Sequence, residues 1–176
     1  IYRALVPLPD ISYSDIEIVS PLVAVNANPA IGPQLLNLGP DLYEQNESFQ
    51  NAAYLGSGDS INVQNLAIFP DANEHPFVPA DNDFFRVVAQ DTGTLDFQVY
   101  FNTYPGLLPG GGDINIVVRD SGGSAIVGPF GVNNFGGNNA NERVRIPAVA
   151  GQTYYLHVFS NVLPLGVNGY DVTITN

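Results

Sequence analysis

The stretch Asp81–Val87, with sequence DNDFFRV, is the strongest fold signal in this chain. Two carboxylates and an amide stand directly before the aromatic residues Phe84 and Phe85, which favour a strand. The stretch therefore predicts a polar loop that runs straight into a buried strand. Carboxylate and amide oxygens are the ligands that hard cations prefer, so this loop is a natural place to hold one.

A second acidic cluster lies upstream at Asp41–Phe49, with sequence DLYEQNESF. If the fold brings both clusters together, their oxygens can form one calcium site. Such a site would fasten the beginning of a domain to its first core strand.

Composition limits the classes of protein to consider. Hydrophobic residues make up 45% and charged residues 12% of the 176 residues, as in a folded chain with one substantial core. All five basic residues are arginines, and 17 acidic residues bring the formal net charge to -12. This charge argues against nucleic-acid and anionic-membrane partners, because both require basic patches.

Two residue types are missing altogether. The absence of cysteine excludes disulfides, thiolate catalysis and zinc–sulfur sites. Methionine is absent even from position 1, so we expect Ile1 to be a mature N-terminus exposed by removal of a signal sequence, or the start of a trimmed chain. The sequence contains no apolar run long enough to span a bilayer. Together these features predict a secreted or cell-surface protein.

Residues 1–40 differ from the rest of the chain. Prolines recur too often in this segment for a helix. Asp15–Val19 alternates polar and apolar residues, and Leu22–Val25 is an apolar run, so both predict extended chain. The segment is too short to bury its own apolar residues. We expect an extended arm that packs either on the following domain or on another molecule.

Residues 41–176 predict an all-β domain, an antiparallel β-sandwich of the jelly-roll kind. The clearest alternation is Thr94–Asn102, with Leu95, Phe97, Val99 and Phe101 inward. A phase slip within Ser60–Phe69 predicts a β-bulge. Phe84–Ala89 is apolar on both faces, as a central strand should be. The other expected strands are 113–120, 125–127, 143–146, 153–160 and 169–175.

Five pieces in this order resemble the bacterial pre-peptidase C-terminal domain, a β-sandwich module often appended to secreted peptidases. Glu44–Ala52 is similar to the family's E-x-N-[DN]-S-F opening, and Asp81–Val87 to its D-x-D-[YF]-[YF]-x-[FV] motif. The other pieces are Thr92–Leu95, Asp113–Ile116 and Ala150–Val158. The resemblance covers residues 41–176 and leaves the arm unmatched.

In calcium-binding members of this family, the opening motif and the D-x-D loop supply ligands to the same metal region. The resemblance therefore implies calcium ligands at Glu44, Asn46, Glu47, Asp81 and Asp83. Glu47 departs from the usual Asp or Asn, and Leu42 stands where some members have a further acid. The alternative interpretation is that these acids are solvated loop residues.

Catalytic motifs are missing from the sequence. Neither G-x-S-x-G nor H-E-x-x-H occurs, and no carboxylate pair is singled out for glycoside hydrolysis. His157 lies in a predicted strand and is expected to be a satisfied sheet residue. His75 lies in an acidic loop where solvation is expected. The sequence therefore predicts a protein that is not an enzyme.

Two functions from different classes remain. The first is a structural subunit of an extracellular filament or surface assembly, which polymerises by donating the arm to a neighbouring sandwich and is stabilised by calcium. The second is a calcium-dependent module that binds polysaccharide or a matrix protein. The size of the protein in solution separates these hypotheses.

Overall fold

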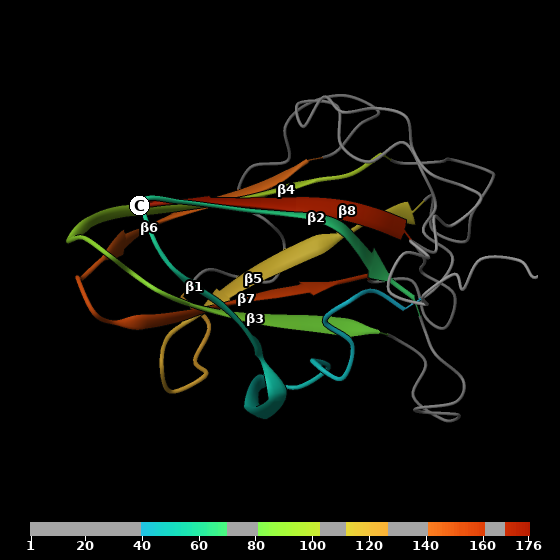
Figure 1. Cartoon of the computed structure of the whole chain (residues 1–176), viewed down its shortest axis with the longest axis horizontal. Helices are drawn as coiled ribbons and strands as arrows, with labels where there is room; N and C mark the ends of the chain where they lie inside the picture. Colours follow the sequence, from blue (N-terminus) through green and yellow to red (C-terminus); the bar gives the residue numbers. More distant parts are fainter. Residues whose placement is uncertain (1–39, 70–80, 103–111, 127–140, 161–167) are drawn as a thin grey trace, which may run out of the picture.

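The computed structural model describes residues 40–69, 81–102, 112–126, 141–160 and 168–176, which form two four-stranded sheets packed face to face (Figure 1). The predicted all-β sandwich is confirmed. A single-turn 3₁₀ helix, η3 (Phe49–Asn51), precedes the strands. The strands are β1 (Ala53–Ser57), β2 (Ser60–Ile68), β3 (Asn82–Val88), β4 (Gly93–Tyr100), β5 (Asn115–Arg119), β6 (Glu142–Ala148), β7 (Thr153–Phe159) and β8 (Asn168–Thr175).

The first sheet has the strand order β1-β3-β7-β5, and the second has the order β2-β8-β4-β6. Neighbouring strands are antiparallel with one exception, because β1 pairs parallel with β3. The strand β1 was not predicted from the sequence. It contains Gly56 with a positive φ of 105°, and its register against β3 shifts at this residue. Glycine adopts this conformation readily, but it has no side chain and so weakens the alternation of apolar and polar residues by which a strand is predicted.

The core lies between the two sheets. The first sheet contributes buried side chains from β3 and β7, namely Phe85, Val87, Leu156 and Val158. They face buried side chains of the other sheet, among them Phe97, Val99 and Ile174. β3 lies between β1 and β7, which confirms the predicted central strand. The predicted inward residues of β4 are also buried as expected.

The bulge predicted in β2 lies between Val63 and Leu66. Asn65 takes up the extra residue in the left-handed conformation at φ 60°, and its backbone N–H donates to Asp171 Oδ1 at 3.0 Å. Asparagine is one of the few residues other than glycine that adopts this conformation readily.

One expected strand is wrong in part. Ala125 forms only an isolated bridge to Arg119, and Ile126 donates its N–H to Val118 O, so this piece is a short return after β5 and not a strand of a sheet. Val127 and the predicted arm at residues 1–39 lie outside the described residues. Within the described parts of the chain, no helix is long and apolar enough to cross a membrane.

Candidate metal centre

The two acidic motifs meet where β3 begins. Asp83 belongs to the inward-facing row of β3 and is fully buried. The Tyr170 hydroxyl of β8 donates to Asp83 Oδ2. With its amide nitrogen facing these acceptors, Asn46 donates to Asp83 Oδ1 at 3.1 Å and to Tyr43 O at 3.3 Å.

The backbone of the opening motif is joined to the same strand. Phe84 N–H donates to Asn46 O at 2.9 Å, so the buried Asn46 contacts β3 through both its backbone and its side chain. Tyr43 packs edge-on against Phe85, with ring centroids 5.8 Å apart. These contacts bring the loop 41–48 against the start of β3.

Two further carboxylates, those of Asp41 and Asp81, connect this region to β2 and to Phe69, which follows β2. Asp41 accepts the N–H of Ala67 at 2.9 Å through Oδ2 and the N–H of Tyr43 at 2.6 Å through Oδ1. Asp81 Oδ2 accepts the N–H of Phe69. Asp41 is not among the five residues that the resemblance implied as ligands.

Glu44 and Glu47 lie on the loop itself and are partly buried. Glu44 Oε1 accepts the N–H of Asp41 at 3.1 Å, and Glu47 Oε1 accepts the N–H of Gln45 at 3.2 Å. All five residues that the resemblance implied as ligands therefore lie on the loop 41–48 or beside the start of β3.

The electrostatics of this cluster are unfavourable without a cation. Burial and the negative charge of Asp81 raise the pKa of Glu44 to about 8. Burial raises the pKa of Asp81 to about 7, and the charges of Asp41 and Glu47 act in the same direction. Backbone hydrogen bonds to Asp81 oppose this rise. Burial, and next the charge of Asp81, raise the pKa of Asp83 well above its ordinary value. Both ion pairs of the described residues involve Asp96, on the other sheet, so neither neutralises this cluster.

The donor chemistry fits a hard cation, since every candidate ligand is an oxygen and calcium accepts about six to eight of them in flexible geometry. The side chains do not yet converge on one point. Among the described residues, no group of three or more His, Asp or Glu side chains has an arrangement ready to hold a metal ion. Asp41, Asp81 and Asp83 direct oxygens at backbone N–H groups or at Tyr170 instead.

His157 has the structural role that the sequence predicts. It lies between Phe84 and Phe159 with its ring stacked on both, and Asn82 Oδ1 is 2.9 Å from its Nε2. Burial, and next the charge of Arg119, lower its pKa to about 3, so the ring is neutral. His75 lies outside the described residues.

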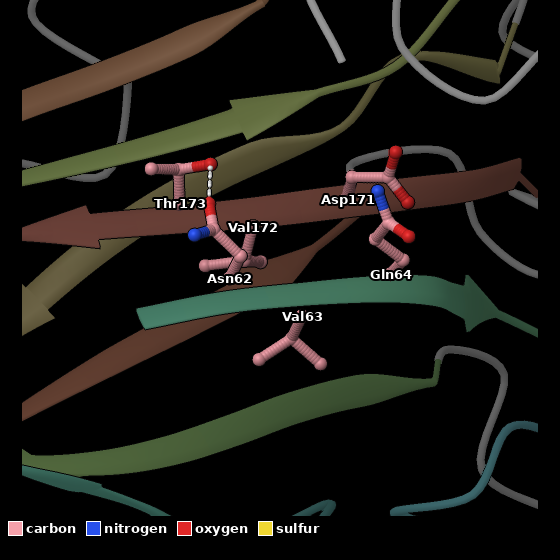
Figure 2. A pocket seen from close by; sticks show the side chains of 6 residues that line it. All are labelled: Asn62, Val63, Gln64, Asp171, Val172 and Thr173. Carbon is pink, nitrogen blue, oxygen red and sulfur yellow. Dashed lines mark hydrogen bonds between the residues drawn. The ribbon is translucent and has the colours of Figure 1, made fainter. Parts of the chain in front are cut away.

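A second polar feature lies on the outside of the other sheet. A hollow of about 490 Å³ runs along the neighbouring strands β2 and β8 (Figure 2). Thr173 Oγ1 donates to Asn62 Oδ1 at 2.9 Å, and Gln64 and Asp171 line the other part of the hollow. Val63 points away from these polar side chains (Figure 2). The hollow offers amide, hydroxyl and carboxylate groups for hydrogen bonding.

No protein-family model matches this chain, and no curated protein is similar to it in sequence. Among solved structures, the pre-peptidase C-terminal domain of a collagenase from Bacillus anthracis is 13% identical, with a TM-score of 0.38 over 70% of this chain and 92% of that one. PliG from Aeromonas hydrophila, a periplasmic inhibitor of g-type lysozyme, is 11% identical, with a TM-score of 0.39 over 70% of this chain and 96% of that one.

A β-glucosidase from Paenibacillus barengoltzii is 12% identical, with a TM-score of 0.34 over 70% of this chain but only 11% of its own. One of these structures is thus a domain of the family that the motifs resemble. At these identities and TM-scores the likenesses concern the arrangement of strands alone. The class defined by the fold is an all-β sandwich, and its acidic loop is a candidate metal centre.

Proposed function

We propose that this chain is a non-enzymatic, secreted structural protein, a subunit of an extracellular filament or surface assembly that calcium stabilises. The observation that carries the proposal is the cluster of buried carboxylates where residues 1–40 lead into the sandwich. Asp41, the first residue of the domain, is bonded to Ala67 of β2 and interacts electrostatically with Asp81 and Asp83.

Calcium at this cluster would relieve the mutual repulsion of the carboxylates. Glu44, Glu47 and Asp81 would supply charged oxygens, and Asn46 and Asp83 would support the loop from inside. The ion would also fix the loop 41–48 against β3, because its ligands come from both. Calcium binding would therefore rigidify the joint between the arm and the sandwich.

The arm is the proposed means of assembly. An extended segment that adds a strand to the sheet of the next subunit makes head-to-tail contacts that do not close, and such contacts produce fibres. Since the arm directly precedes Asp41, a rigid joint would set the angle between successive subunits.

Negative-stain electron microscopy of the purified chain, with calcium and after chelation, tests this proposal. Filaments that weaken on chelation are expected. The double variant Glu44→Gln, Asp81→Asn should mimic chelation, whereas Asp59→Asn, an exposed acid in the turn between β1 and β2, should leave filaments unchanged. Single particles under every condition would contradict assembly.

Deletion of residues 1–33 separates donation of the arm from a role of the arm in its own domain. Loss of filaments with an intact sandwich, judged by circular dichroism and thermal unfolding, would support donation. Loss of the folded state would show that the arm belongs to its own core.

The polar hollow on β2 and β8 favours a second candidate, a module that binds polysaccharide. Sugar hydroxyls donate and accept hydrogen bonds, and Asn62, Thr173 and Asp171 provide both kinds of partner. Tyr100 is the cross-strand neighbour of Asp171 and supplies an aromatic ring close by. Affinity electrophoresis in polysaccharide gels tests this: Asn62→Ala should lose retardation, and Thr94→Ala, exposed at the far end of β4, should not.

A further inference from the structure

A second pair of carboxylates lies where β5 and β6 begin. β5 and β6 are the edge strands of the two sheets on the same side of the sandwich, and they contact each other. Asp113 stands two residues before β5, and Glu142 is the first residue of β6. Neither residue belongs to the acidic loop described above.

The two strands begin at the same end of the molecule. Asn115 and Asn82 both pair with Phe159, so β5 starts where β3 starts. Glu142 pairs with Val99, near the end of β4, and Tyr100 of β4 pairs with Asp171, near the start of β8. The bond from Tyr170 to Asp83 joins the start of β8 to the start of β3, which brings all four strand starts to one end.

Glu142 occupies a position where an apolar residue would be expected. It shares the inward row of β6 with Val144, Ile146 and Ala148, and only 4% of its surface is exposed. Its Oε2 atom is buried and has no hydrogen-bond partner among the described residues. A buried carboxylate oxygen without a partner is strongly unfavourable, so a position that keeps one calls for a counter-charge.

Among the described residues, no ion pair involves Glu142. Arg143 and Arg145 form ion pairs with Asp96. Arg86 lies over the ring of Tyr54, and Arg119 contacts Gly123 O and His157. The chain contains no lysine. Burial, and next the negative charge of nearby Asp113, raise the pKa of Glu142 to about 7.

Hydrogen bonds from Asn168 hold the chain directly before Asp113 in place. Asn168 Nδ2 donates to Gly112 O at 2.6 Å and to Asn102 O at 2.7 Å, which fixes the residue before Asp113 against the start of β8. Asn115 Nδ2 donates to Asp113 Oδ2 at 3.3 Å and orients that carboxylate. The Oδ1 atom of Asn168 is itself buried and has no hydrogen-bond partner within the described parts of the chain, so it is a second unpaired oxygen at this end of the sandwich.

We infer that Asp113 and Glu142 bind a second divalent cation of the calcium class, which bridges the neighbouring edges of the two sheets. The ligands are oxygens, which suit calcium rather than zinc, and water and backbone carbonyls complete the shell. Asn168 is a positioning residue in this site. The ion ties β5 to β6, the edges at which the two sheets would otherwise separate.

Calcium titration by isothermal calorimetry, with thermal unfolding in parallel, tests this site without reference to filaments. Glu142→Gln keeps the shape of the side chain and removes its charge. We expect this variant to bind one calcium ion fewer, or to bind that ion with a lower affinity. The loss of affinity should exceed the factor of about ten that follows from losing an outer-shell partner. The calcium-induced rise in Tm should shrink accordingly, and Asp59→Asn should bind as the natural chain does.

The double variant Glu44→Gln, Asp81→Asn separates the two sites. If it still binds calcium and loses that binding when Glu142→Gln is added, the second site stands whether or not the acidic loop binds an ion. Unchanged stoichiometry and affinity in Glu142→Gln would overturn the inference. If Glu142→Gln fails to fold, Asp113→Asn, at a partly exposed position, decides by the same titration.

Discussion

The hydroxyl of Tyr170 on β8 donates to the carboxylate of Asp83 on β3, and both side chains are fully buried. This bond crosses from one sheet of the sandwich to the other. It supplies the Asp83 carboxylate with a partner in the interior, and burial together with the negative charge of Asp83 raises the pKa of Tyr170 well above its ordinary value. Tyr170 is therefore the internal support of the acidic loop.

Removal of that hydroxyl should destabilise the protein. Tyr170→Phe leaves Asp83 Oδ2 buried without its donor, and such an orphaned group costs about 1–3 kcal/mol. Urea denaturation monitored by circular dichroism should show a lower free energy of unfolding. Tyr54→Phe, at a position that is 53% exposed, is the matched control and should change it little. Equal stability of the two variants would show that Asp83 does not depend on Tyr170.

The metal-free protein should lose stability as the pH rises. The pKa of Glu44 is raised from 4.5 to about 8 and that of Asp81 from 3.8 to about 7, so between these values the folded state binds more protons than the unfolded state. The free energy of unfolding then falls with rising pH, from about pH 4 to about pH 8.

Thermal unfolding in a chelator at a series of pH values measures this slope. Saturating calcium should flatten it, because an ion that binds the ionised carboxylates favours the charged form. A stability that rises with pH across the same window in chelator would contradict the repulsion inferred for this cluster.

Side-chain periodicity predicted much of the fold. The alternation in β4 and the slip in β2 were visible because burial on one face imposes a period of two residues. β1 was missed because its burial follows no such alternation, and its parallel pairing with β3 depends on contacts distant in the sequence. Propensity alone also predicted a strand at Ala125 and Ile126, where Ala125 forms only an isolated bridge to Arg119.

The candidate site was predicted in part for a similar reason. The motifs located Asn46 and Asp83, and the backbone of Asn46 is bonded to Phe84, the residue after Asp83. Tyr170 lies 87 positions from Asp83, and nothing local marks it as a partner of that acid. Nothing in the sequence marks Glu142 either. An acidic residue at the start of a strand is common, and only the structure shows that this side chain faces the interior.

The two arginines that contact Asp96 should contribute unequally. Asp96 faces outward on β4 yet is only 7% exposed, because Arg143 donates to both of its oxygens through Nε and Nη2, and Arg145 donates through Nε at 2.9 Å. Arg143→Ala removes a two-point contact with a sheltered carboxylate, for which we expect a loss of about 1.5–3 kcal/mol. Arg145→Ala removes an exposed contact and should cost about 0–1 kcal/mol. Urea denaturation ranks the variants, and a larger loss for Arg145→Ala would contradict this assignment.

The bulge residue Asn65 provides a test of backbone conformation. Its φ of 60° is in the left-handed region, which disfavours residues with a Cβ by about 1–2 kcal/mol, least for Asn and Asp. Asn65→Val should therefore destabilise the protein by about 1–2 kcal/mol, whereas Asn65→Gly should be close to neutral because glycine adopts this conformation freely. Both variants keep the backbone N–H that donates to Asp171, so the comparison isolates the conformational term. Thermal unfolding measures it, and a Val variant as stable as the Gly variant would mean that β2 shifts its register to remove the bulge.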